Sequence, residues 1–290
     1  MNPKANNFSI NLFQINLAVL FISTSGVLGR YIDLPTPIII GLRSLIGGLA
    51  LYIFCRWRGF DLKIGSKDSR TVLIGGILLG AHWLTYFYSL KLSNVAIGML
   101  SLFTFPAITA ILEPIILKTK FLKSHLLLGA TVLIGIYFLV PEFDLENDHM
   151  KAVGFGVLSA FCYAIRNIIL KPKVSQYNGS VLMTYQLFAI TVILCPLTFI
   201  LDSSNIVEFL PATLLLAILT TAIGHTMLVY SLKHFSTASA SIISSLQPVY
   251  GIILGIIFLS EYPKSTTIIG GLIIVSSVAV ESLRVYKVKT

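Results

Sequence analysis

The side chains that could do chemistry lie within long apolar segments, at spacings that place them on shared helix faces. One stripe consists of His82, Tyr86 and Ser89, with Trp83 adjacent to it, and a second consists of Ser159, Tyr163 and Arg166. A polar stripe on an apolar helix faces other protein or a water-filled cavity. We expect His82, Trp83, Tyr86 and Tyr163 to line a site for a small molecule. Hydrogen bonding between helices is the alternative for each single hydroxyl.

Arg43 lies seven residues into an apolar segment, where an unpartnered guanidinium costs several kcal/mol. We expect it to line a path and attract an anionic group; the alternative is that it clamps free carbonyls or extends outward. Glu113 and Arg166 each lie about five residues from the end of an apolar segment. At equal depth they would pair and act as a gate. Extension toward the membrane surface is the alternative for both, and Glu113 is also a candidate proton carrier.

The composition shows what surrounds these residues. The chain has 290 residues, of which 56% are hydrophobic and 11% charged, against about 25% charged in soluble domains. This excludes a soluble enzyme, a disordered protein and a nucleic-acid binder. We predict an all-α membrane protein, because a helix of about 20 apolar residues crosses a bilayer. The ten predicted spans are Ile15–Tyr31, Pro37–Phe54, Thr71–Leu90, Val95–Leu117, Leu122–Val140, Ala152–Leu170, Ser180–Leu201, Pro211–Leu232, Ala238–Leu259 and Thr266–Leu283.

The charges orient these spans. With ten spans both termini lie on one side, and that side holds fifteen Lys and Arg against two Asp, a net +13. The opposite loops hold four basic against eight acidic residues, a net −4. Cytoplasmic loops carry the excess of Lys and Arg. We therefore expect both termini to be cytoplasmic and assign the net charge of +9 to orientation on an anionic leaflet, with no nucleic-acid partner. We expect the acidic stretch Glu142–Asp148 to be a solvated outer loop, with weak calcium binding as the alternative.

The chain contains a repeat. Tyr88-Ser89-Leu90-Lys91 recurs as Tyr230-Ser231-Leu232-Lys233, and the same offset of 142 residues aligns Pro106 with Pro248, Gly129 with Gly271 and Trp83 with His225. Each half holds five spans, an odd number, so the second half enters the membrane inverted. Two inverted five-helix repeats are a transporter architecture.

The aligned prolines mark the expected centre of the molecule. Pro106 and Pro248 each lie near the middle of a predicted span and free the carbonyls of Leu102 and Ser244. Interrupted spans at matching positions of two halves indicate a transporter site. We expect both prolines to flank a polar cavity; a kink that only shapes packing is the alternative. The further candidate site residues near them are His225, Ser244, Gln247 and Tyr250.

A family resemblance rests on the second half. Ser245-Leu246-Gln247-Pro248-Val249, then Gly251-Ile252-Ile253-Leu254-Gly255, Phe258-Leu259-Ser260-Glu261 and Gly270-Gly271 resemble the signature of the EamA-type family of drug/metabolite transporters. Ser260 replaces the usual glycine, and Glu113-Pro114 stands where the second half has Gly255-Ile256. The resemblance implies two repeats, 8–141 and 150–285, and peripheral fifth and tenth spans. It also implies export of amino acids or related metabolites across a bacterial inner membrane.

Other classes fit the sequence less well. It contains no Walker motif, H-E-x-x-H or G-x-S-x-G, which argues against ATP-driven transport and an intramembrane enzyme. A passive channel or scaffold remains an alternative class. Among carriers, the alternatives are an importer of a metabolite such as S-adenosylmethionine and a multidrug efflux carrier. We expect a small-molecule substrate and the lipid bilayer as partners, and no cofactor or metal; the sequence does not indicate an oligomeric state.

Overall fold

The computed structural model describes residues 3–92, 95–139, 147–260 and 265–289, and these residues form helices and no strands. The helices are α1 (Pro3–Tyr31), α2 (Thr36–Trp57), α3 (Ser66–Leu92), α4 (Val95–Leu102), α5 (Phe105–Leu117), α6 (Lys123–Leu139), α7 (Asn147–Leu170), α8 (Gly179–Leu194), η1 (Cys195–Phe199), α9 (Ile206–Leu215), η2 (Leu216–His225), α10 (Thr226–Ser231), α11 (Thr237–Ser244), α12 (Gln247–Leu259) and α13 (Ser265–Lys289). The predicted all-α class is confirmed.

Seven segments are long and apolar enough to cross a membrane. They are Phe8–Gly29, Thr36–Trp57, Ser66–Leu92, Met150–Leu170, Gly179–Phe199, Ile206–Ser231 and Thr237–Phe258. Three shorter apolar helices, Phe105–Leu117, Lys123–Gly135 and Ile268–Glu281, fall on the remaining three predicted spans. The count of ten spans stays a prediction.

Two of the predicted spans are broken at their prolines. The chain leaves α4 at Leu102 and starts α5 at Phe105, with Pro106 in the first turn of α5. It leaves α11 at Ser244 and starts α12 at Gln247, with Pro248 in the first turn of α12. A first-turn proline loses nothing by lacking an amide proton. Each proline therefore starts a new helix instead of kinking a continuous one.

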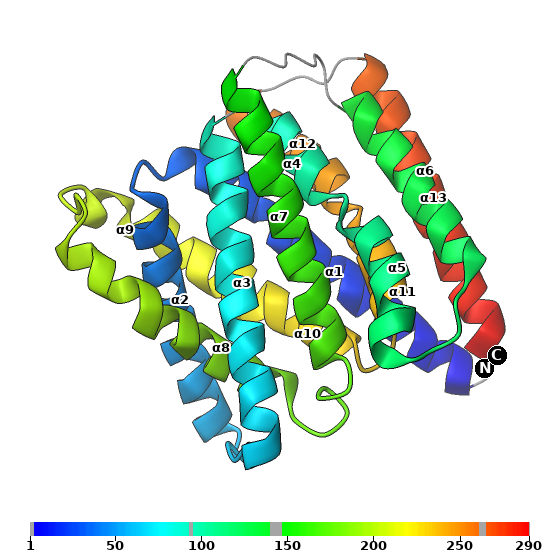
Figure 1. Ribbon diagram of the computed structural model, residues 1–290, viewed down its shortest axis with the longest axis horizontal. Coiled ribbons are helices and arrows are strands. Elements are labelled where there is room, and N and C mark those ends of the chain that lie inside the picture. Colours follow the sequence, from blue (N-terminus) through cyan, green and yellow to red (C-terminus); the bar gives the residue numbers. More distant parts are fainter. Residues whose placement is uncertain (1–2, 93–94, 140–146, 261–264, 290) are drawn as a thin grey trace.

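The two broken helices repeat residue for residue. Adding 142 to the bounds of α4 and α5 gives the bounds of α11 and α12. Both pairs also end in the same way, on a left-handed residue with positive φ: Lys118 at 52° and Ser260 at 56°. In Figure 1, α4 lies above α5 whereas α12 lies above α11, so the two broken helices run in opposite directions.

Helices α6 and α13 form a pair beside the rest of the molecule (Figure 1). A Cβ on Gly135 would lie 2.8 Å from a side-chain carbon of Ile274 and 3.0 Å from the Gly270 carbonyl oxygen, so the absent side chain permits the close approach. Among the other helices the most extensive contacts are those of α3 with α7 and of α2 with α8, and Trp83 and Phe87 of α3 are among the largest buried side chains.

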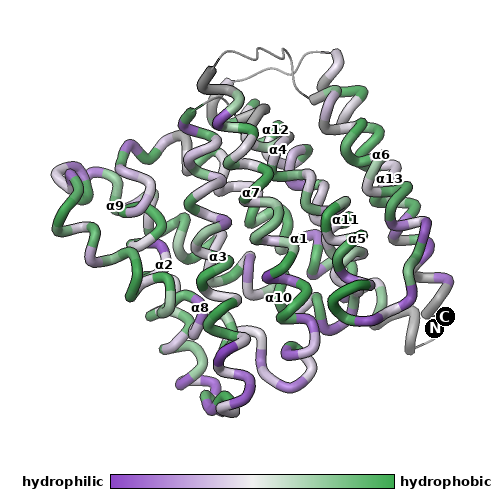
Figure 2. Tube along the Cα trace, viewed as in Figure 1, coloured by the Kyte–Doolittle hydropathy of each residue, from purple (hydrophilic) through white to green (hydrophobic). Residues whose placement is uncertain are grey.

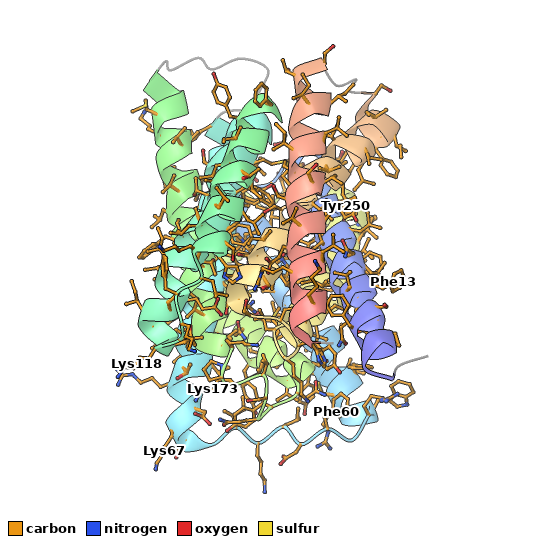
Figure 3. All side chains as sticks on the ribbon, turned by 90° about the vertical axis from the view of Figure 1, so that its right-hand side faces the viewer. Phe13, Phe60, Lys67, Lys118, Lys173 and Tyr250 are labelled. Atoms are coloured by element: carbon orange, nitrogen blue, oxygen red, sulfur yellow. The ribbon has the colours of Figure 1, made fainter. Side chains whose placement is uncertain are left out.

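The outer surface is apolar. Phe13, Leu127, Val192, Val207 and Phe258 are each exposed by 67% or more, and Figure 2 shows hydrophobic residues along the helices with hydrophilic residues gathered at their ends. A surface of this kind needs lipid around it. Lys67, Lys118 and Lys173, assigned to one side by their charge, lie at the same end of the molecule (Figure 3). The start of α1 and the end of α13 lie near each other in Figure 1. The acidic stretch 142–148 and Glu261 fall on residues whose side chains the structure does not describe.

Candidate functional site

A small cavity lies among the helices, between the two halves of the chain. Its volume is about 20 Å³, which is room for about one water molecule. Its lining comes from both halves of the chain, and consists of Ile22, Ser25, Arg43, His82, Trp83, Tyr86, Phe87, Leu102, Phe103, Phe105, Tyr163, His225 and Gln247. Phe105 and Gln247, which stand directly before the two first-turn prolines, are among them. The two helix breaks thus place the first residues of α5 and α12 in the cavity wall.

Arg43 is the one cation of this lining. It comes from α2, is 1% exposed, and lies with its guanidinium carbon 4.0 Å from the centre of the Trp83 ring. Its Nε donates to the Thr221 hydroxyl at 3.0 Å, and its Nη2 donates to Thr221 at 2.7 Å and to Thr220 at 3.1 Å. Within the described part of the chain, Nη1 has no hydrogen-bond partner and no carboxylate pairs with this guanidinium.

The two threonines that hold Arg43 lie in η2, a π-helical segment. The wider turn of a π-helix is frequent at functional sites. The Thr220 hydroxyl donates to the Leu216 carbonyl at 2.5 Å, and the Thr221 hydroxyl reaches the same carbonyl at 3.2 Å. Each hydroxyl oxygen is therefore oriented with its lone pairs toward the guanidinium. The sequence analysis missed both residues, because two threonines in an apolar run read as ordinary helix-packing residues.

His82 is oriented by Ser159 of α7. The Ser159 hydroxyl donates to the His82 carbonyl at 2.8 Å, so the contact of 2.8 Å between that hydroxyl and His82 Nδ1 has the ring nitrogen as donor. The neutral imidazole then carries its proton on Nδ1 and presents Nε2 as an acceptor. The His82 ring stacks on Tyr163, with 4.3 Å between ring centres, and lies nearly parallel to Tyr86 at 6.3 Å.

His225 of η2 also lines the cavity and contacts two of its aromatic rings. Its ring meets Trp83 edge to face, with centres 5.1 Å apart, and Tyr163 at 6.2 Å. Its Nδ1 is buried and has no hydrogen-bond partner among the described residues. A buried polar atom without a partner costs about 1–3 kcal/mol. Such an atom in a cavity wall is available to a ligand.

Arg166 and Glu113 take partners other than each other. Arg166, fully buried, donates to the side-chain oxygens of Gln186 and Asn167, each at 2.9 Å, and its Nη2 contacts the Met183 sulfur at 2.9 Å. Glu113 accepts the backbone N–H groups of Thr237 at 2.7 Å and Ala238 at 2.8 Å. The predicted ion pair is not formed, because the carboxylate is engaged by the positive N-terminal end of α11.

A second cluster lies near that helix end. The buried Glu281 accepts from Arg284 at 2.7 and 2.8 Å and from the Ser239 hydroxyl at 2.5 Å. Arg284 also contacts His125 Nε2 at 2.7 Å. Together with Glu113, this cluster ties α5 and α6 of the first half to α11 and α13 of the second.

The structure brings together seven of the eleven residues that the sequence analysis selected for binding: Arg43, His82, Trp83, Tyr86, Tyr163, His225 and Gln247. The other four do not line the cavity. Ser244 bonds to the Ala240 carbonyl of its own helix at 2.8 Å. Pro106 and Pro248 stand one residue behind the wall, and Tyr250 lies a turn further along α12.

These features define a multi-pass membrane protein with a polar site enclosed between two halves. The chain belongs to the EamA-like transporter family, whose model matches residues 10–140 and again residues 150–283. The family resemblance of the sequence is thereby confirmed, and it points to a transporter rather than an enzyme.

Individual relatives extend the match over most of the chain. The pseudopaline exporter CntI of Pseudomonas aeruginosa (strain UCBPP-PA14) is 26% identical over 270 residues, covering 89% of this chain and 92% of that protein. The uncharacterized transporter YwfM of Bacillus subtilis (strain 168) is 23% identical over 289 residues, covering 94% and 95%. A solved crystal structure has the same fold, with a TM-score of 0.81 at 17% identity over 97% of this chain and 99% of that one.

Proposed function

We propose that this protein is a secondary transporter that carries a small metabolite bearing a carboxylate, with amino acids as the first candidates. It works by alternating access between two inverted five-helix repeats that together make ten spans. It exports its substrate across the bacterial inner membrane, with both termini in the cytoplasm. Release of the substrate chemically unchanged separates this carrier from an enzyme.

The observation that carries the proposal is the environment of Arg43. Its guanidinium is buried in a cavity wall, is held by hydroxyls and a ring face, and has no acidic partner among the described residues. A buried cation without a counter-ion is costly. A carboxylate matches the planar fork of a guanidinium better than other small groups do. An anionic substrate at Nη1 would therefore complete the site.

The aromatic walls support a metabolite with an apolar or aromatic part. Trp83, Tyr86 and Tyr163 provide ring faces and edges around the cavity. Because the cavity holds only about one water molecule, a substrate enters only when the halves move apart. This requirement is met by alternating access.

The direction of transport has separate support. The relative from Pseudomonas is named as an exporter. The end of the molecule that carries most of the Lys and Arg residues is the one expected in the cytoplasm. A carrier runs in either direction with its gradient, so direction follows from the driving force.

The experiment is counterflow in proteoliposomes with a panel of radiolabelled amino acids, other carboxylates and organic cations. We expect saturable counterflow of at least one carboxylate and no transport of the cations. Non-saturating flux would indicate a channel. Transport of organic cations without competition by any carboxylate would contradict the proposal and favour a multidrug carrier.

A further inference from the structure

A larger cavity lies between the two halves, away from the central site. Its volume is about 300 Å³, at the lower end of the range for small-molecule sites. It is lined by α1 and the end of α2 from the first half, and by the start of α8 and by α10 from the second. The lining residues are Gln14, Phe54, Phe60, Asn178, Gly179, Ser180, Thr226, Met227 and Tyr230. Phe60 lies at the same end of the molecule as Lys67 and Lys173 (Figure 3).

Two chain segments connect this cavity to the central one. His225 lines the central cavity and the next residue, Thr226, lines the larger one. Both have a buried polar atom without a hydrogen-bond partner among the described residues, Nδ1 and Oγ1 respectively. On α1, Ser25 lines the central cavity and Gln14 the larger one. Eleven residues make about three helical turns, so both side chains point from the same face, about 16 Å apart.

At the other end of the molecule, α3 contacts α7. By the repeat, this contact corresponds to that of α10 with α1, and it is closed. Tyr88 and Ser89 of α3 both engage α7: the Tyr88 ring lies 5.8 Å from the Phe155 ring, and the Ser89 hydroxyl donates to the Ala152 carbonyl at 2.7 Å. Tyr230 and Ser231, at the equivalent positions of the second half, instead contact residues of their own chain segment. Tyr230 packs on His234 at 5.2 Å, and Ser231 donates to the Leu228 carbonyl at 2.7 Å.

From this asymmetry we infer that the larger cavity is the cytoplasmic vestibule through which the transported metabolite reaches the central site. The contact of α1 with η2 and α10 is then the inner gate, and the contact of α3 with α7 is the outer gate. The inference rests on the proposed function. Glu113 ties α5 to α11, and Lys171 after α7 donates to the carbonyls of Leu232 and Phe235. We therefore assign the opening to the contact of α1 with η2 and α10.

At the inner gate, η2 and α1 approach each other closely at Gly224 and Ile22. A Cβ on Gly224 would lie 3.0 Å from Ile22 Cγ1 and 3.3 Å from the Ile22 backbone nitrogen. Ile22 itself lines the central cavity. Separation of α1 from η2 at this contact would open the central cavity toward the vestibule, with the buried Ile15, Ala18 and Val19 of α1 lying along the way.

The lining of the vestibule indicates what it admits. The described residues that line it carry no charge. Phe54 and Phe60 meet edge to face at 5.9 Å, while uncharged polar groups come from Gln14, Asn178, Ser180 and Thr226. A compound with an apolar part and a carboxylate finds weak contacts here and its ionic partner only at Arg43. The vestibule therefore admits the substrate without retaining it.

The test measures access from each face with a thiol reagent and needs no identified substrate. Cys55, Cys162 and Cys195 are first replaced by alanine, and Ser25→Cys is introduced in the central cavity. The probe is 2-sulfonatoethyl methanethiosulfonate, a small impermeant anion. It is applied to inside-out vesicles, where it reaches the cytoplasmic face, and to spheroplasts, where it reaches the outer face.

We expect faster labelling in inside-out vesicles than in spheroplasts. Adding Thr226→Trp, which fills the vestibule, should slow cytoplasmic labelling about tenfold or more, a barrier increase of about 1.4 kcal/mol. Met227→Trp is a second variant that fills the vestibule. Both tryptophan variants are used only if they purify as monodisperse protein, which shows that they fold. Val192→Trp, on the exposed face of α8, is the matched control and should leave the rate unchanged.

The assignment of the larger cavity as a cytoplasmic vestibule would be contradicted by an unchanged labelling rate in both tryptophan variants, or by labelling from the outer face alone. Because the transported substrate takes no part in labelling, this outcome is separate from the counterflow result. A vestibule that passes the thiol test in a protein that moves no carboxylate would refute the proposed substrate alone.

Discussion

Trp83 and His225 stand at equivalent positions of the two halves, 142 residues apart, and their rings meet with centres 5.1 Å apart at an angle of 70°. In a two-fold arrangement a residue contacts its own equivalent only close to the axis. The contact therefore places Trp83 and His225 close to the axis of the proposed inverted repeat, beside the central cavity that both residues line. A site on the axis is reached equally from either side when the halves rock.

His225→Phe should stabilise the protein and impair transport. The ring contact with Trp83 is kept, while the buried Nδ1 that lacks a described partner is removed, which relieves about 1–3 kcal/mol. We expect a higher midpoint of thermal unfolding in detergent together with slower counterflow. His82→Phe is the comparison, because it loses the Ser159 bonds and should lower both. Unchanged counterflow in His225→Phe would argue against a substrate contact at this residue.

Thr221→Val should destabilise the protein more than Thr220→Val does. Thr221 accepts two bonds from Arg43 and Thr220 accepts one, and valine is close in shape to threonine. Loss of a hydrogen bond to a charged group costs about 1.5–3 kcal/mol. Thermal unfolding measures the order, with Thr213→Val as the control, since that hydroxyl bonds only to the Phe209 carbonyl of its own helix. Equal midpoints for the Thr220 and Thr221 variants would contradict the proposed support of Arg43.

Much of the fold follows from the sequence, for physical reasons. Apolar length alone places every helix long enough to span, and the recurring Tyr-Ser-Leu-Lys motif fixes the offset that the helix bounds repeat. Helical spacing puts His82 and Tyr86 on one face, so they reach one cavity together. Arg43 is recognisable because a guanidinium in an apolar segment needs a partner.

The sequence is less informative about which distant groups meet. Glu113 and Arg166 carry opposite charges at similar depth, yet Glu113 binds the start of α11 and Arg166 binds amide oxygens. The partial positive charge at a helix N-terminus comes from the backbone, so the side-chain charges of the sequence do not reveal it. Thr220 and Thr221 are likewise placed by a π-helical turn, which no sequence period here announces.

Gly156→Ala should destabilise the protein, while Gly154→Ala should not. Both glycines lie on α7, but a Cβ at position 156 would lie 2.1 Å from the Ser101 Cβ, whereas one at position 154 meets nothing within 4 Å. Overpacking costs about 1–3 kcal/mol, and alanine in an open helical position gains about 0.5–1 kcal/mol. Thermal unfolding of the pair checks this. Equal midpoints would mean that α4 and α7 separate easily.

Glu113→Ala should weaken the connection between α5 and α11. The two bonds removed, at 2.7 and 2.8 Å, join the carboxylate to backbone N–H groups, and loss of a hydrogen bond to a charged group costs about 1.5–3 kcal/mol. Glu113→Gln keeps one acceptor oxygen and should lose about half as much. Thermal unfolding gives the order, and a glutamine variant less stable than the alanine variant would contradict the capping role.

The central claim, that Arg43 binds the carboxylate of the substrate, is tested most directly by counterflow of the transported carboxylate through Arg43→Gln and Arg43→Lys. We predict that both lose most activity, because lysine keeps the charge and loses the planar fork. Arg70→Gln, at an exposed position, is the matched control and should transport at the parent rate. Parent-level counterflow in the folded Arg43→Gln variant would contradict the account.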